Sequence, residues 1–284
     1  MKLTKQQARL HSQAEAMLTQ DVLSHDDKLF VLEHWREDAN HVNSTAGAFF
    51  TPWQLALDFA LDAIGGGGRP LTSLRIIDLC AGIGTLSLAC QARHEWDEYN
   101  GAPPLDITCV EANPAYAAVG RKMLPEACWI EASIFDLPEL GRFDVAISNP
   151  PFGRIKRDGD APRYRGGEFE YHVIDIAGQL AATGAFILPA TSAGFTLSGR
   201  AGGYQEIRSA KLEAFAAQTG IELEAGCGID TAYEGYGSWH GVNPQVEIVT
   251  CDFPTAPVVA LPEVQATVPH NPGDYDGDLF GGAA

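Results

Sequence analysis

The sequence has few basic residues for its length. Lysine and arginine total 19, whereas aspartate and glutamate total 37, so the 284-residue chain has a formal net charge of −18. Because so acidic a protein is repelled by the phosphate backbone at long range, the composition counts against a protein that grips long stretches of nucleic acid unaided. The cations that are present gather in one segment, at Arg154, Lys156, Arg157, Arg163 and Arg165.

The chain also lacks a long apolar run. No stretch approaches the roughly 18 residues that a membrane-crossing helix needs, and residues 1–7 contain no apolar segment of the signal-peptide kind. Hydrophobic residues make up 45% of the sequence, which is ample for a folded core. We therefore expect a soluble, cytoplasmic protein with no membrane partner.

Paired cysteines are absent as well. The six cysteines form no Cys-x-x-Cys pair, and no histidine stands at zinc-finger spacing from them. Several lie within apolar, strand-like runs, where a thiol behaves as a small hydrophobic side chain. We expect buried thiols, and no metal site.

A rigid turn follows a short apolar run at residues 148–153, Ser-Asn-Pro-Pro-Phe-Gly. Pro150 and Pro151 end the strand, because neither has a backbone N–H and both fix φ near −65°. The Asn149 side-chain oxygen and the Pro150 carbonyl are both acceptors, so at a fixed spacing they could take both hydrogens of one planar amine. Phe152 could stack on the ring that carries the amine. The alternative is an ordinary turn, since asparagine and proline are common turn residues.

A glycine-rich turn follows an earlier strand, in the segment Asp-Leu-Cys-Ala-Gly-Ile-Gly-Thr at 78–85. The apolar run before it predicts a strand and residues 86–94 predict a helix, which is the opening of a nucleotide-binding βα unit. Gly82 and Gly84 allow the backbone to turn tightly and approach a ligand. Ser87 stands where the dinucleotide fingerprint has a third glycine, so the segment departs from that form.

The next predicted strand, 105–111, ends in Glu111. A carboxylate at the tip of this strand can accept two hydrogen bonds from ribose hydroxyls. The alternative is a surface glutamate beside a helix cap.

Together these segments resemble the class I S-adenosylmethionine-dependent methyltransferases, specifically the amino-methyltransferases that modify N6 of adenine. The resemblance covers residues 47–153. It rests on five motifs in the family's order, at residues 47–52, 78–85, 110–114, 129–136 and 149–152. It implies S-adenosyl-L-methionine as the cofactor and assigns catalysis to the turn: Asn149, Pro150, Pro151 and Phe152. It assigns cofactor binding to Phe50, Thr51, Pro52, Asp78, Cys80, Gly82, Gly84, Glu111, Ala112, Ile134, Phe135, Asp136 and Asn149.

Particular roles follow from the same resemblance. Phe50 to Pro52 would line the methionine end of the cofactor, and Asp78 with Gly82 would hold its amino-acid part. Asp136 would accept the cofactor's adenine amine, with Ile134 or Phe135 against the ring.

Two segments are candidates for contact with nucleic acid. The basic loop 154–167 follows the turn, so Arg154, Lys156 and Arg157 could contact phosphates beside a target base; a solvated loop is the alternative. Tyr236 and Trp239 lie in the connection between the last two predicted strands and could stack on bases. Packing within their own loop is the alternative for these two aromatics.

These segments predict an α/β fold: a Rossmann-like, seven-stranded, mostly parallel sheet of the class I methyltransferase type. The methyltransferase domain would span 47–255, after an N-terminal helical extension at 1–46 with helices at 4–20 and 27–39. Segment 256–284 is acidic, and we expect it to be disordered.

Within the domain we expect three further local features. Thr51 would cap a helix that starts at Pro52. A glycine-rich loop at 190–204 would precede a helix at 205–219. The last two strands, 221–227 and 246–253, would pair as a terminal hairpin.

The sequence thus predicts an enzyme that methylates N6 of adenine in nucleic acid, with DNA favoured over RNA. A glutamine-amide methyltransferase is a further option, because an amide also presents a planar NH2. A different class, motivated by the net charge, is a non-catalytic DNA mimic or regulatory protein on the same scaffold. A protein partner or homodimer stays open, as does a role in restriction-modification, regulation or self-protection of a phage or plasmid.

Overall fold

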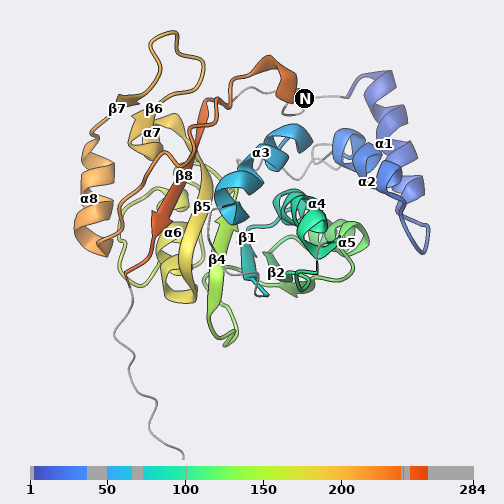
Figure 1. Cartoon of the computed structure of the whole chain (residues 1–284), viewed down its shortest axis with the longest axis horizontal. Coiled ribbons are helices and arrows are strands. Elements are labelled where there is room, and N and C mark those ends of the chain that lie inside the picture. Colours follow the sequence, from blue (N-terminus) through green and yellow to red (C-terminus); the bar gives the residue numbers. More distant parts are fainter. Residues whose placement is uncertain are drawn as a thin grey trace, which may run out of the picture. The chain divides into compact units, whose positions relative to one another are not determined.

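The computed structural model describes residues 3–36, 50–65, 73–99, 101–237, 239 and 244–254. Its main sheet has six strands in the order β3-β2-β1-β4-β5-β8 (Figure 1). The strands are β1 (Arg75–Leu79), β2 (Asp106–Glu111), β3 (Cys128–Glu131), β4 (Phe143–Ser148), β5 (Ala181–Pro189) and β8 (Val246–Asp252).

The first five strands are parallel, and β8 runs antiparallel to β5. From β1 the chain first builds outward through β2 and β3, then returns to the other side of β1 with β4. The strand order therefore reverses between β1 and β4, and ligands of open α/β sheets bind at the carboxyl edge of such a point. The predicted Rossmann-like fold is confirmed.

Helices cover both faces of the sheet (Figure 1). Two neighbouring residues of β1 show this, because successive side chains of a strand point to opposite faces. Ile76 packs into one core cluster and Ile77 into the other. The first cluster includes residues of α3 (Trp53–Ile64), α4 (Thr85–Tyr99) and α5 (Pro114–Met123), and the second includes residues of α6 (Phe169–Leu180) and α8 (Ala210–Thr219). Strands buried on both faces read as continuous apolar runs, which is why the sequence revealed them.

The described part of the predicted N-terminal extension contains the helices α1 (Lys5–Met17) and α2 (His25–His34). Each begins with a capping box, formed by Thr4 with Gln7 in α1 and by Ser24 with Asp27 in α2. Both predicted helices therefore exist but are shorter than expected, and residues 37–39 of the second lie outside the described residues.

The strand predicted at 221–227 is not formed, whereas the one predicted at 246–253 is present as β8. Segment 221–227 makes only one antiparallel bridge, between Glu224 and Thr250 of β8. Gly226 adopts a left-handed φ of 57°, and the Cys227 N–H donates to the Asp62 carboxylate at 2.8 Å. The backbone leaves the ladder after this bridge, where Gly226 turns and the Cys227 N–H bonds to a side chain of α3.

Three other local expectations were wrong. Helix α3 begins at Trp53 with Pro52 at its cap, and no side chain caps it. The expected loop at 190–204 contains a short helix α7 (Ala190–Ala193) and strand β6 (Phe195–Thr196). Strand β6 pairs with β7 (Gln205–Glu206), so α8 starts only at Ala210, capped by Ser209. A single turn of 3₁₀ helix, η2 (Glu234–Tyr236), follows later.

The chain divides into one compact unit, Met1–Pro254, and a second, Thr255–Ala284. The predicted acidic tail lies outside the described residues. All six cysteines are free thiols; Cys90, Cys109 and Cys251 are buried, but Cys128 and Cys227 are exposed, against expectation. Across the described ranges, none of the helices has the length and apolar character needed to cross a membrane.

Candidate active site

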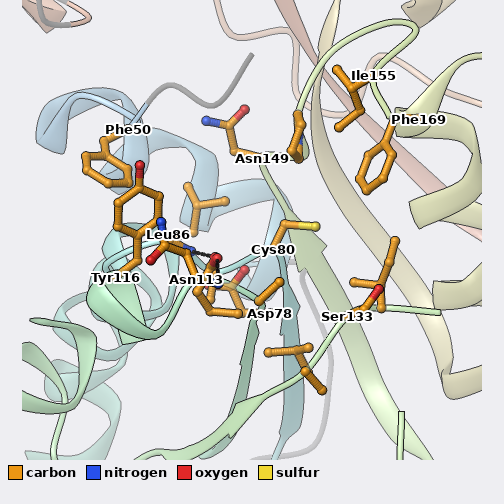
Figure 2. Close-up of a pocket in the computed structure, with 18 of the residues that line it drawn as sticks. Phe50, Asp78, Cys80, Leu86, Asn113, Tyr116, Ser133, Asn149, Ile155 and Phe169 are labelled. Atoms are coloured by element: carbon orange, nitrogen blue, oxygen red, sulfur yellow. Dashed lines mark hydrogen bonds between the residues drawn. The ribbon is translucent and has the colours of Figure 1, made fainter. Parts of the chain in front are cut away.

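A pocket of about 530 Å³ opens at the carboxyl ends of β1, β2 and β4. Figure 2 shows Phe50 and Tyr116 at one end of it and Ser133, Ile155 and Phe169 at the other. The residues that line it are Phe50, Thr51, Asp78, Cys80, Ala81, Gly82, Thr85, Leu86, Val110, Glu111, Ala112, Asn113, Tyr116, Ala132, Ser133, Ile134, Asn149, Pro151, Ile155, Lys156, Arg157, Asp158 and Phe169.

The turn after β1 forms the floor of this pocket. Gly82 and Gly84 have φ values of 59° and 83°, a region that glycine adopts without strain. Cys80, which is not a glycine, also has a positive φ, of 60°. A Cβ on Gly82 would lie 3.0 Å from the Phe50 ring, so the backbone comes close to that aromatic side chain. Gly84 is not among the lining residues; its Cβ position faces Trp129 instead.

Glu111, at the tip of β2, is held by the backbone on both sides. One carboxylate oxygen accepts the Gly82 N–H at 2.7 Å and the other accepts the Asn113 N–H at 2.8 Å. Burial raises the pKa of Glu111, and the backbone hydrogen bonds act in the opposite direction. Since a carboxylate has about four lone-pair sites, each oxygen can still accept a hydroxyl.

Asp78, at the end of β1, is 1% exposed. Its Oδ2 accepts the Ser87 hydroxyl at 2.7 Å, whereas Oδ1 is buried with no hydrogen-bond partner among the described residues. Burial raises the pKa of Asp78 to about 7; the Ser87 hydrogen bond lowers it, and the nearby charge of Glu111 raises it. An orphaned acceptor beside a pocket suits a ligand that brings a donor such as an amine.

Asn149 follows β4 directly, on the wall of the pocket (Figure 2). Its Nδ2 donates to the Thr51 hydroxyl at 3.0 Å, so the amide is tied to the segment just before α3. Thr51, expected as a helix cap, is thus engaged with the predicted catalytic residue. Pro151 also lines the pocket, but Pro150 is buried and Phe152 packs against the core cluster, and neither is a lining residue.

A buried glutamate, Glu170, accepts a hydrogen bond from the backbone at the end of the Asn-Pro-Pro-Phe turn. The Gly153 N–H donates to Glu170 at 2.8 Å, and the other oxygen of Glu170 accepts the Ser192 hydroxyl at 2.6 Å. Glu170 is fully buried on α6. The sequence analysis missed this residue, because its partners lie 17 and 22 positions away.

The basic loop after the turn is anchored to α6 instead of being loosely solvated. Arg163 pairs with the fully buried Asp175 at 2.6 Å, and the Ala161 N–H donates to His172 at 3.0 Å. Arg165 donates to backbone carbonyls within the loop. Arg163 and Arg165 therefore stabilise the folded conformation of this loop.

The cations named for substrate contact have different environments. The Arg154 side chain is 81% exposed, and Lys156 is also exposed. Arg157 is paired with Asp160 at 2.9 Å. Lys156 and Arg157 line the pocket, whereas Arg154 does not.

The tip of β3 differs from the sequence-based assignment. Asp136 is exposed and lies outside the pocket lining, as does Phe135. Ile134 lines the pocket, together with Ser133, whose hydroxyl donates to Asp158 at 2.9 Å. The sequence analysis missed Ser133 and Asp158, because it assigned the acidic role at this strand end to Asp136, which is nearer in sequence.

The aromatic side chains before β8 are held by the protein. Trp239 is 3% exposed and belongs to the core, so the structure does not place it for stacking on a base. The Tyr236 hydroxyl donates to Asp58 of α3 at 2.6 Å. Tyr233, 65% exposed, meets the Tyr236 ring edge-on at 5.4 Å.

The N-terminal helices reach the pocket through aromatic side chains. The Trp35 ring, just after α2, lies 5.8 Å from both Phe50 and Tyr116, and those two rings are 5.1 Å apart. Phe50 and Tyr116 line the pocket, so Trp35 supports this wall from behind. Pro52 is not a lining residue.

No family model matches the sequence. Solved structures do resemble it. A Listeria monocytogenes protein described as a class I S-adenosylmethionine-dependent methyltransferase has a TM-score of 0.56 at 13% identity; the match covers 93% of this chain and 78% of that one.

Two further structures with a TM-score of 0.51 come from restriction-modification systems. One is described as the modification subunit of a type I restriction enzyme from Vibrio vulnificus (14% identity, 81% of this chain and 49% of that one). The other is a type I methyltransferase subunit from Streptococcus thermophilus (13% identity, 83% and 51%). The chain thus spans about half the length of these two subunits. At these identities the likeness establishes the fold, and the described part of the chain has the fold of the class I S-adenosylmethionine-dependent methyltransferases.

Proposed function

We propose that this protein transfers a methyl group from S-adenosyl-L-methionine to the N6 amine of adenine in DNA. What carries the proposal is the position of Asn149, which lies on the wall of the strand-edge pocket and is hydrogen-bonded to Thr51. The first residues of the Asn-Pro-Pro-Phe turn therefore stand beside the groups that would hold the cofactor.

The pocket fits this cofactor in two respects. The orphaned Oδ1 of Asp78 would accept the cofactor's amino group, and the carboxylate of Glu111 would accept its ribose hydroxyls. The Gly82 backbone borders the pocket directly, and a side chain at this position would crowd the Phe50 ring. Bound S-adenosylmethionine supplies a sulfonium methyl group that is already activated.

Asn149 would act on the target amine. Its Oδ1, with the Pro150 carbonyl, would accept the amine hydrogens and direct the nitrogen lone pair toward the methyl carbon. The new bond joins nitrogen to the methyl carbon while the carbon–sulfur bond breaks and its electron pair remains on sulfur; the amine then releases one proton to water. The acceptors also stabilise the positive charge that develops on nitrogen.

The rest of the turn and loop would serve the substrate. A base within a duplex is out of reach, so the target would be flipped out, with Phe152 against its ring. The exposed side chains of Arg154 and Lys156 would contact flanking phosphates, which offsets locally the repulsion expected from a net charge of −18. The names of the two restriction-modification subunits support DNA as the substrate.

Transfer of labelled methyl from S-adenosylmethionine to duplex DNA, single-stranded DNA and RNA tests the proposal. We expect N6-methyladenine in DNA with the wild-type chain and none with Asn149→Ala. Label on RNA alone would replace DNA by RNA as the substrate. Cofactor binding without label on any nucleic acid would instead favour a protein amide substrate or a non-catalytic role.

A further inference from the structure

The end of the pocket beyond Glu111 is where the base of a bound nucleoside would lie. With the ribose held at the tip of β2, the base would extend toward the neighbouring strand β3. The apolar side chains lining this end are those of Ile134, Ile155 and Phe169, which suits a flat ring; Figure 2 shows Ile155 and Phe169 there. The ring's exocyclic amine then needs an acceptor, because a buried donor without a partner is costly.

The carboxylate that faces this end comes from the loop after the turn. Asp158 lines the pocket, and its Oδ1 accepts the Ser133 hydroxyl at 2.9 Å. The Ser133 oxygen in turn accepts the Phe135 N–H at 3.3 Å, which leaves its hydrogen for Asp158. Asp158 Oδ2 makes no hydrogen bond to this serine, so it can accept from a ligand.

A second contact fixes the loop in this place. A Cβ on Gly159 would lie 2.6 Å from the Phe135 side chain, closer than real Cβ contacts come, so the backbone passes directly over that residue. Together, the Ser133 hydrogen bond and this backbone contact dock residues 158–159 on the tip of β3. The loop is therefore part of the pocket wall.

We propose that Asp158, positioned by Ser133, accepts the exocyclic amine of the cofactor's adenine. This deepens the proposed function, since it rests on S-adenosylmethionine being the ligand. Asp158 takes the role that the sequence pattern assigned to Asp136; both residues are exposed, but only Asp158 lines the pocket. One loop then contacts the cofactor through Asp158 and the substrate through its exposed cations.

The test compares S-adenosylhomocysteine with S-inosylhomocysteine, which carries a carbonyl oxygen in place of the amine. We expect the wild-type chain to prefer the adenine form by roughly tenfold, the scale of one hydrogen bond to a charged acceptor. Asp158→Ala should reduce that preference to near unity. Asp158→Asn keeps an acceptor oxygen and should retain part of it, and Asp136→Ala, the matched control, should leave it unchanged.

The dissociation constants are measured by isothermal titration calorimetry, with circular dichroism to check that each variant is folded. An unchanged preference in Asp158→Ala would overturn the inference, as would a loss caused by Asp136→Ala. If the wild-type chain binds neither compound, the cofactor in the proposed function fails and this inference with it. If it binds both and Asp158→Ala changes nothing, only this inference fails.

Discussion

Replacing Asp78 by asparagine should remove a pH dependence from the stability of this protein. Burial raises the pKa of Asp78 to about 7 from an ordinary value of 3.8. Between these values the native state keeps a proton that the unfolded chain has released. The free energy of unfolding therefore falls as pH rises through this window, and the stabilisation present at low pH is lost above pH 7.

The size of the effect follows from the width of the window. From pH 5 to pH 7 the native state binds about one proton more than the unfolded state at this site, and each unit corresponds to about 1.4 kcal/mol. Wild type should therefore lose about 3 kcal/mol from this group between pH 5 and pH 8. Asp78→Asn is neutral throughout, can still accept the Ser87 hydroxyl, and should not share this loss.

Urea denaturation, followed by tryptophan fluorescence at pH 5, 6, 7 and 8, gives the free energy of unfolding of Asp78→Asn and of wild type. The difference between the two free energies should shift by about 3 kcal/mol in favour of Asp78→Asn from pH 5 to pH 8. Asp136→Asn, at an exposed position, serves as the control. A difference that stays constant with pH would refute the reasoning, because Asp78 would then be ionised in the native state.

Two further predictions test the architecture of the site. Gly82→Ala should weaken binding of S-adenosylhomocysteine at least tenfold by calorimetry, because an L-residue is strained at φ 59° and its Cβ would lie 3.0 Å from Phe50; binding at wild-type strength would contradict the close backbone approach. Arg163→Met should lower the free energy of unfolding by about 2–4 kcal/mol in urea, since it leaves Asp175 buried without its cation. An effect below about 0.5 kcal/mol, the usual range for surface positions, would indicate that the loop is not anchored at this pair.

The sequence by itself determined the parallel sheet and the principal site segments. Strands buried on both faces require continuous apolar runs, and the glycines of the β1 turn are required by the backbone conformation. Glu111 ends its strand and Asn149 directly follows its own, so their place at the carboxyl edge follows from chain order alone. The capping boxes at the starts of α1 and α2 are also local, because each joins residues three positions apart.

Only the tertiary structure decided which distant side chains meet. Thr51 could have capped its own helix, but its hydroxyl accepts from Asn149, 98 positions away. Asp158 and Ser133 meet across 25 positions, and the strand predicted at 221–227 is limited to one bridge. Composition left phosphate contact and a solvated loop as alternatives for the basic segment, whereas the structure shows that the buried Asp175 on α6 anchors it. Periodicity and local hydrogen bonds can be read along a chain, but the choice among competing partners depends on which groups the fold brings within bonding distance.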